Sequence, residues 1–190
     1  MERRVTNSNG GLTFVEMEPS PDVAAWTDRF AGPVPDGGQV EVQLAASSWV
    51  AHHLGLMGSG VLLLIDYGDL AENLEHRRPQ GTVRTYRDHH LGPDPLREPG
   101  ATDITMDVNF SAVISTAEEA GAAVEFMRQD EFLERHGLVD RIRALRTAEL
   151  EAARAGRTME QLQYKSAITE ANTLLHPRGL GDFRVAILRK

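Results

Sequence analysis

The order of apolar and polar residues predicts strands at the start of the chain and helices after them. Residues 12–17 alternate between apolar and polar positions and are rich in β-prone side chains. An Asn- and Gly-rich turn at residues 7–11 precedes them, so residues 3–18 are expected to form a hairpin. Prolines and glycines are frequent in residues 19–38, which predicts a loop with about one helical turn.

An uninterrupted apolar segment fills residues 61–65 and is followed by the carboxylate of Asp66. Such a segment is typical of a central parallel strand that is buried on both faces. Before this strand, Ser47 or Ser48 is expected to cap a helix that runs to about Met57.

The next segment, residues 67–103, is rich in proline, glycine and histidine. It is too long for an idle connection in a compact domain, so we predict a functional loop. Asp66, Tyr67 and Gly68 stand where the predicted strand ends, which is the edge at which open α/β sheets bind ligands. The alternative is that Asp66 only caps a turn or a neighbouring helix.

The last part of the chain is predicted to be mainly helical. Asn109 is expected to cap a helix that stops at Gly121, and residues 123–127 are expected to form a short strand. Helical spacing continues over residues 129–175, and residues 183–188 are predicted to be a final strand. This order predicts an α/β sheet with a helical insertion before its last strand, in a single partial domain over residues 1–190.

Composition narrows the classes of function. The 190 residues include 20 basic and 28 acidic side chains, a formal charge of −8, which disfavours a general affinity for nucleic acid. The chain has no cysteine, which excludes disulfides, zinc–thiolate sites and thiol nucleophiles. No apolar run is long enough to span a membrane and residues 5–10 form no signal-peptide core, so we expect a cytoplasmic protein without a membrane segment.

Glycine and histidine motifs are the other candidates for a cofactor-binding, metal-binding or catalytic site. The Gly-x-Gly sequences at 58–60 and 179–181 each follow a predicted helix and precede a predicted strand, the reverse of the order in a nucleotide-binding loop. We therefore expect no cofactor-binding loop in this chain. The histidines lack metal-ligand spacing, so we expect no metal site, but His89 or His90 is a candidate donor of a proton or hydrogen bond.

The predicted sheet lacks some of its strands. A strand as apolar as residues 61–65 needs a neighbour on each side and helices on both faces. Later strands can supply one neighbour, but the only earlier strands are those of a polar hairpin. The sheet is therefore expected to be missing its first half.

Several segments together resemble the MidA-like family of S-adenosylmethionine-dependent methyltransferases, which includes a mitochondrial arginine methyltransferase. The matching segments are residues 60–68, 81–87 with His89, 103–110, 129–133 and 179–185. The resemblance covers only the second half of the family's class I, Rossmann-like domain. Its glycine loop for the cofactor, its acidic residue after the second strand and its Asn-Glu motif after the fourth have no counterpart here. Residues 61–66, 123–127 and 183–188 would then be the fifth, sixth and seventh strands.

The resemblance implies the acceptor side of a methyltransferase that acts on a protein or peptide, with arginine as the acceptor. Carboxylates suit this chemistry, because they bind a planar guanidinium and favour loss of its proton as the nitrogen attacks. The implied catalytic residues are Asp66 and Asp103, and the implied acceptor-binding residues are Tyr67, Gly68, Thr82, Arg84, His89 and Thr105. An ion pair within the loop is the alternative role for Arg84.

The resemblance also implies that S-adenosylmethionine binds only together with a partner. We expect this partner to be a second polypeptide that carries the cofactor-binding half, and a homodimer is the alternative. The alternative function is a non-catalytic module that binds another protein. The family tends to have His and Asp within the segment where this chain has Asp107 and Asn109, so any part that this histidine has in chemistry or in shaping the pocket is lost here.

Overall fold

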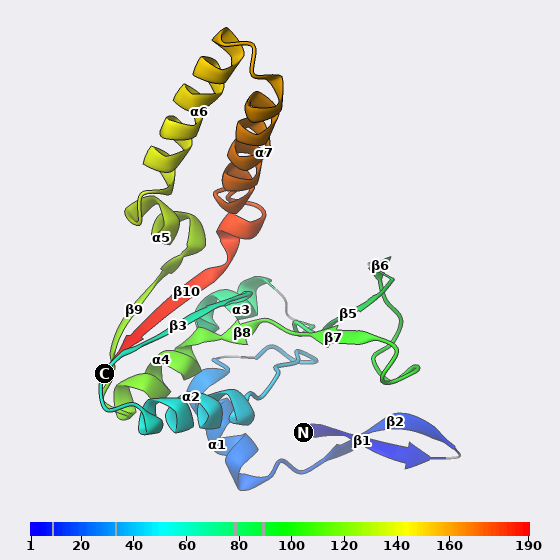
Figure 1. The fold of residues 1–190 in the computed structure, drawn as a ribbon. Helices are drawn as coiled ribbons and strands as arrows, with labels where there is room; N and C mark the ends of the chain where they lie inside the picture. Colours follow the sequence, from blue (N-terminus) through cyan, green and yellow to red (C-terminus); the bar gives the residue numbers. More distant parts are fainter. Residues whose placement is uncertain (9, 33, 78–79, 89) are drawn as a thin grey trace. The chain divides into compact units, whose positions relative to one another are not determined.

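The computed structural model describes residues 1–8, 10–32, 34–77, 80–88 and 90–190 (Figure 1). The chain is a mixture of helices and strands, as the sequence predicts. It divides into two compact units, each made of segments that are separated in the sequence. Unit 1 comprises residues 1–60, 68–123 and 190, and unit 2 comprises residues 61–67 and 124–189.

Unit 1 contains four helices and several short strands among its described residues. In chain order these are β1 (Glu2–Ser8), β2 (Gly11–Met17), α1 (Pro21–Phe30), α2 (Leu44–Leu56), β4 (Gly68–Asp69), α3 (Ala71–Arg77), β5 (Arg84–Arg87), β6 (His90–Leu91), β7 (Asp103–Thr105), β8 (Val108–Asn109) and α4 (Phe110–Glu119). The hairpin predicted over residues 3–18 is present as β1 and β2, which pair antiparallel with Val5 opposite Phe14. Strand β5 pairs antiparallel with both β6 and β7, and β4 pairs parallel with β8.

Helix α1 occupies much of the segment that was predicted to be a loop, so that prediction is wrong. Its start follows the usual rules for a helix N-terminus. The Ser20 hydroxyl accepts a hydrogen bond from the Val23 amide, Pro21 stands in the first turn, and Asp22 adds a negative charge there. Proline was therefore a signal for a helix start here rather than for a loop.

Helix α2 begins before the serines that were predicted to cap it. It starts at Leu44, and the Ser48 hydroxyl donates to the Leu44 carbonyl inside the helix instead of capping it. The buried residues of α2 are Val50 and Leu54, which are four positions apart and share one face. Helix α2 therefore starts directly after Gln43, a residue of the candidate site.

Helix α4 confirms the prediction made from Asn109 and Gly121. The Asn109 side-chain oxygen accepts from the Ala112 amide and caps the helix, and Gly121 follows its end with a φ of 81°. Phe110 and Val113 of α4 are buried, and α4 packs against α2. These two helices form the core that supports the candidate site.

The segment over residues 67–103 is not the continuous loop that was predicted. It contains β4, α3, β5 and β6, and β7 begins at its last residue. Because β5 pairs with β7, this segment forms a small antiparallel sheet. Residues 84–87 of this segment are therefore held by strand pairing on both sides.

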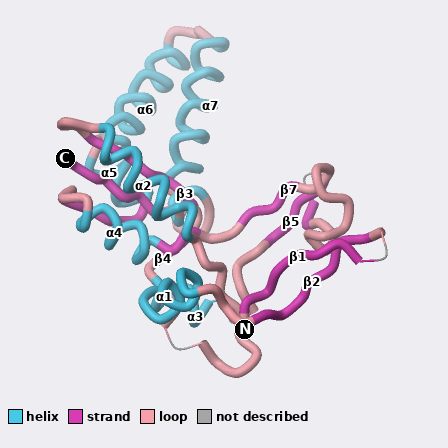
Figure 2. Tube along the Cα trace, turned by 90° about the horizontal axis from the view of Figure 1, so that it is seen from below, coloured by secondary structure: helices cyan, strands magenta, loops and turns pink. Residues whose placement is uncertain are grey.

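Unit 2 consists of a three-stranded sheet and a helical insertion. Its elements are β3 (Val61–Asp66), β9 (Ala123–Arg128), α5 (Gln129–Arg135), α6 (Leu138–Arg154), α7 (Thr158–Leu174), the short 3₁₀ helix η1 (Leu180–Asp182) and β10 (Arg184–Arg189). The long helices α6 and α7 lie side by side (Figures 1 and 2). None of the helices found in the described part of the chain has the length and apolarity that crossing a bilayer requires.

Strand β3 differs from the central parallel strand that was predicted. The sheet order is β3-β10-β9, and β10 runs antiparallel to β3 with Arg184 opposite Asp66. No described strand pairs with the other edge of β3, so it is an edge strand in this structure. It is not buried on both faces either, since Val61, Leu63 and Ile65 are 56%, 45% and 43% exposed.

The core of unit 2 lies along β10, whose residues 184–188 are all buried. Val185 and Ile187 pack with Met127 of β9, and Phe132 of α5 packs against them. At the start of α5, the Arg128 guanidinium donates to the carboxylates of Asp130, at 2.9 Å, and Asp182, at 2.7 Å. The hydrogen bond from Arg128 lowers the pKa of Asp130.

Candidate functional site

Strand β3 ends at Asp66, whose carboxylate accepts a hydrogen bond from the next residue. Oδ1 of Asp66 accepts a hydrogen bond from the Tyr67 amide at 2.7 Å, which agrees with the turn-capping alternative. The Asp66 side chain is nevertheless exposed. The ring of Tyr67 packs against that of Phe183, with 4.3 Å between the centroids. Both residues belong to unit 2.

Gly68 allows two backbones to approach closely in unit 1. It pairs with Val108 in the parallel β4–β8 ladder and has a φ of 149°. A Cβ atom at this position would lie 2.1 Å from the Val108 carbonyl oxygen, so no other residue fits without a shift of the backbone. The buried carboxylate of Asp69 then accepts from the Leu70 amide and the Asn73 side chain, which fixes the start of α3.

The β5–β7 pair places the predicted residues Arg84, Thr105 and Asp103. Arg84 lies opposite Thr105, and Asp103 lies opposite Tyr86. The Arg84 guanidinium donates to Oδ1 of Asp107 at 2.5 Å, and the two side chains are only 18% and 11% exposed. Arg84 is therefore in an ion pair, but its partner Asp107 lies beyond the predicted loop over residues 67–103, so the alternative of a pair within that loop is not what the structure has.

Thr82 connects two carboxylate-bearing segments. Its amide donates to Oε1 of Glu41 at 2.8 Å, and its hydroxyl donates to Oε2 of the same carboxylate at 2.9 Å. The Thr82 hydroxyl oxygen also accepts from the Asp107 amide at 3.0 Å. Gly81 makes room for this contact, because a Cβ atom there would lie 2.5 Å from Oε1 of Glu41.

Gln43 and Asn109 connect the starts of α2 and α4. The Gln43 amide group donates to the Asp107 carbonyl at 2.8 Å and accepts from the Asn109 backbone amide at 3.0 Å. The Asn109 side chain, besides capping α4, donates to the Phe30 carbonyl at 3.0 Å. A carboxylate cannot donate this last bond, so asparagine at this position has a structural reason.

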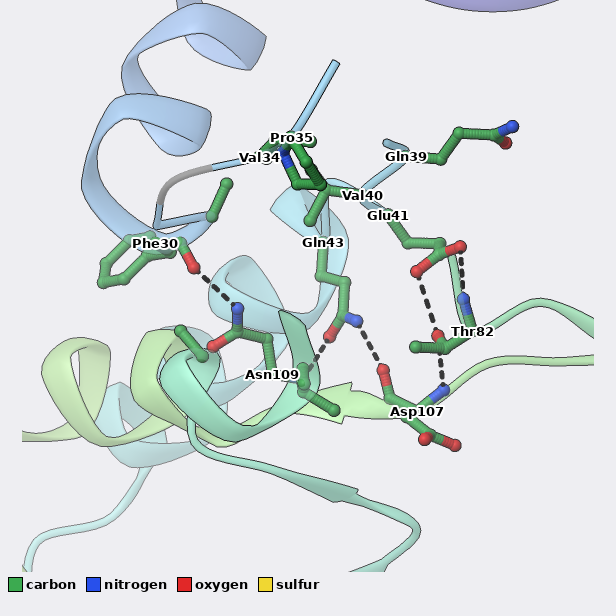
Figure 3. A pocket seen from close by; sticks show the side chains of 13 residues that line it. Phe30, Val34, Pro35, Gln39, Val40, Glu41, Gln43, Thr82, Asp107 and Asn109 are labelled. Atoms are coloured by element: carbon green, nitrogen blue, oxygen red, sulfur yellow. Dashed lines mark hydrogen bonds between the residues drawn. The ribbon is translucent and has the colours of Figure 1, made fainter. Parts of the chain in front are cut away.

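These residues surround a pocket in unit 1 that is partly open to solvent (Figure 3). Apolar walls and polar groups both line it. The apolar residues are Phe30, Ala31, Val34, Pro35, Val40, Ala71 and Leu74, and the polar residues are Gln39, Glu41, Gln43, Thr82, Asp107 and Asn109. The pocket therefore combines the mostly apolar lining and the few convergent polar groups of a small-ligand site.

The structure brings together only some of the predicted site residues. Thr82 lines the pocket, Arg84 is connected to it through Asp107, and Gly68, Asp103 and Thr105 belong to the same unit without lining it. Asp66 and Tyr67 belong to unit 2. His89 lies outside the described residues, and His90 is exposed on β6.

Sequence reasoning missed Glu41 and Gln43 as residues of the site. Glu41 reaches Thr82 across 41 positions, and Gln43 reaches Asp107 across 64. No local motif marks contacts of this kind, because they depend on how the segments fold together. The glycine at position 81 is a sequence feature that agrees with this contact, because a side chain there would clash with Glu41.

The described residues do not fit a cofactor site for S-adenosylmethionine. Gly58-Ser59-Gly60 follows α2 and precedes β3, and Gly179-Leu180-Gly181 follows α7 and precedes β10. A loop that cradles a cofactor stands instead between a strand and a helix, where the helix N-terminus faces the ligand. Within the described ranges, no group of three or more acidic or histidine side chains is placed to hold a metal ion.

A family model matches residues 1–127, two thirds of the chain. Its description is "Putative S-adenosyl-L-methionine-dependent methyltransferase". The matched residues include the whole of the pocket.

The chain is similar to mitochondrial protein arginine methyltransferases of animals. It is 40% identical over 62 residues to the NDUFAF7 homolog of Drosophila melanogaster, a match that covers 33% of this chain and 13% of that protein. It is 30% identical over 123 residues to NDUFAF7 of Xenopus laevis, a match that covers 65% of this chain and 24% of that protein. The matches therefore span less than a quarter of these curated relatives.

Two crystal structures of Burkholderia thailandensis proteins have a similar fold. An uncharacterised protein has a TM-score of 0.76 and 24% identity, with 99% of this chain and 48% of that chain covered. A structure bound to S-adenosyl-homocysteine has a TM-score of 0.77 and 25% identity, with 99% of this chain and 46% of that chain covered. The present chain spans about half the length of both.

Proposed function

Because this chain belongs to the MidA-like family of S-adenosyl-L-methionine-dependent methyltransferases, we propose that it forms the acceptor side of such an enzyme. The observation that carries the proposal is that 99% of the chain matches less than half of a structure holding S-adenosyl-homocysteine. We further propose an arginine side chain of a protein or peptide as the acceptor, since the animal relatives are named as protein arginine methyltransferases.

The cofactor-binding half of the enzyme is proposed to lie outside these 190 residues. The open edge of β3 supports this, because an exposed apolar strand edge favours pairing with another strand. A three-stranded sheet with one apolar edge strand half exposed gains stability when a further strand and its helices cover it. We favour a second polypeptide that supplies those strands, and a homodimer through β3 remains the alternative.

The chain's own residues have a limited chemical task in this proposal. They bind the guanidinium, orient one nitrogen and accept the proton that it loses as it is methylated. Asp66 and Asp103 are the proposed catalytic residues because both carboxylates are exposed and stand in the segments that match the family. Tyr67, Gly68, Thr82, Arg84, His89 and Thr105 remain proposed acceptor-binding residues; Gly68 and Arg84 also have the structural roles described above.

Methyl transfer by the assembled enzyme tests this function. The chain is co-purified with a polypeptide that carries a strand, a Gly-x-Gly loop and an Asn-Glu motif, and transfer from labelled S-adenosylmethionine to an arginine peptide is measured. We expect Asp66→Asn and Asp103→Asn to abolish transfer with folding retained, and Asp28→Asn, an exposed aspartate of α1, to leave it unchanged. Unchanged turnover in both site variants would refute their roles. A stable complex without any transfer would favour a non-catalytic binding module.

The chain alone provides a second test. Calorimetry is expected to detect no tight binding of S-adenosylmethionine, because the described residues form no cofactor loop. Size-exclusion chromatography with light scattering is expected to show that the chain without its partner does not behave as a stable monomer. Micromolar cofactor binding, or a well-behaved monomer with no partner, would contradict the split-enzyme proposal. The cytoplasmic location stays a prediction.

A further inference from the structure

Glu41 is a carboxylate of the pocket, and among the side chains that the structure describes it has no cationic partner. Its printed hydrogen bonds come from three neutral donors, the amide and hydroxyl of Thr82 and the Val83 amide at 3.4 Å. Asp107, the other carboxylate of the pocket, is in an ion pair with Arg84. The negative charge of Glu41 is therefore the one that a positively charged ligand would neutralise.

The position of the Glu41 carboxylate is fixed before any ligand arrives. Figure 3 shows both of its oxygens directed at Thr82, whose hydroxyl oxygen is itself held by the Asp107 amide. An ionised carboxylate has about four acceptor positions, so three hydrogen bonds leave a position for one donor of a ligand. A preorganised acceptor costs little conformational entropy on binding, which favours a specific contact.

The walls of the pocket suit the stem of a long side chain. Phe30, Val34, Pro35, Val40 and Leu74 are apolar and share the pocket with Glu41. Arginine has a three-methylene stem that packs on apolar surface and a cationic head that seeks a polar partner. The net charge of −8 adds a general attraction for a cation.

We propose that this pocket binds the arginine side chain of the acceptor, with Glu41 as the specificity-determining residue. The inference rests on the proposed function for the identity of the acceptor, but its evidence is the apolar walls and a carboxylate that has no cationic partner among the described side chains. Thr82 is a positioning residue that acts through Glu41. Asp66 and Asp103 do not line this pocket, so this assignment and theirs as the residues that accept the guanidinium proton are alternatives, which the Asp66→Asn and Asp103→Asn variants decide.

Peptide binding to the full chain tests the proposal without a methyl-transfer assay. The probes are acetyl-Gly-Arg-Gly-amide and the same peptide with citrulline, which has nearly the same shape and no charge. Binding is followed by NMR through the amide signals of Thr82 and Val83, which donate to Glu41. The arginine peptide is expected to bind at least ~10-fold more tightly, as a hydrogen bond to a charged group implies.

Two variants and a control identify the site. Glu41→Gln is expected to remove the preference for arginine over citrulline, and Ala71→Leu, which fills the pocket, to weaken both peptides by at least ~10-fold. Glu16→Gln changes an exposed carboxylate of β2 and is expected to change nothing. Tryptophan fluorescence verifies that each variant is folded, since Trp26 and Trp49 both belong to unit 1.

The outcomes separate this proposal from the proposed function. A preference that survives Glu41→Gln, or binding that survives Ala71→Leu, overturns the pocket assignment. If the assembled enzyme methylates arginine and Glu41→Gln leaves its KM for the peptide unchanged, the pocket assignment fails and the function stands. If arginine binding depends on Glu41 but no transfer occurs, the pocket assignment stands and the function fails.

Discussion

Replacing Asn109 by aspartate tests whether this residue is held in place by structure. Asn109 is 3% exposed, and its side chain both caps α4 and donates to the Phe30 carbonyl. Aspartate keeps the cap, but its ionised carboxylate cannot donate. We expect Asn109→Asp to lower the free energy of unfolding by about 1–3 kcal/mol for the unpaired carbonyl, and by more for the buried charge.

The pH dependence of this variant distinguishes the cause. Burial and the facing Phe30 carbonyl raise the pKa of an aspartate at position 109, whereas the bond from the Ala112 amide lowers it; we expect burial to dominate and the pKa to lie above its unfolded value of about 3.9. The penalty is therefore fully present above the raised pKa and declines as the pH falls toward about 4, because a protonated carboxyl donates to the carbonyl. Asn109→Ala loses the cap and the donor, about 2–4 kcal/mol in total, at every pH.

Urea unfolding followed by tryptophan fluorescence measures these changes, because both tryptophans belong to unit 1. The transition is recorded between pH 7.5 and pH 4 for the original chain and for both variants. Equal stability of Asn109→Asp and the original chain at pH 7 would refute the role of the donated hydrogen bond. A penalty for Asn109→Asp that does not change with pH would refute the buried-charge argument.

Two further substitutions are informative in other parts of the fold. Gly68→Ala is expected to lower the free energy of unfolding by about 3 kcal/mol or more, because the added Cβ would clash with the Val108 carbonyl at a residue whose φ is 149°. Urea unfolding followed by tryptophan fluorescence measures this, and an unchanged stability would contradict it. Asp130→Asn removes a carboxylate whose pKa is lowered by Arg128. The ion pair between them stabilises the fold above the unfolded pKa of Asp130, and this stabilisation is lost as the pH falls through its lowered pKa in the folded chain. Below about pH 4, far-UV circular dichroism should therefore show the original chain losing more stability than the variant, and parallel losses would contradict the ion pair.

Sequence patterns correctly predicted the helices and strands that depend only on neighbouring residues. Asn109 capped α4 as expected, because a cap needs only the residue and the first turn of its helix. The same logic was available for α1, where Ser20 and Pro21 mark a helix start, but the density of proline and glycine was given more weight. The apolar strand over residues 61–66 was also found from its composition.

The contacts of the site join residues that are far apart in the sequence, so they were harder to predict. Thr82 and Arg84 were identified from the family resemblance, yet their partners Glu41 and Asp107 were not assigned to them. The neighbours of β3 were also misjudged, because an apolar strand has the same composition whether its partner is parallel or antiparallel. Whether the neighbour of β3 is parallel or antiparallel depends on the direction in which β10 runs, and no residue of β3 determines that direction.

The order of the strands in unit 2 has a consequence for biosynthesis. β10 lies between β3 and β9 but is translated after both, so the sheet cannot close until residues 184–189 have left the ribosome. At translation rates of about 5–20 residues per second, β3 waits on the order of ten seconds for this partner. During that interval both edges of an apolar strand are available for pairing with a strand of another polypeptide. A polypeptide that pairs with the outer edge of β3 can therefore join the sheet before the chain has completed it.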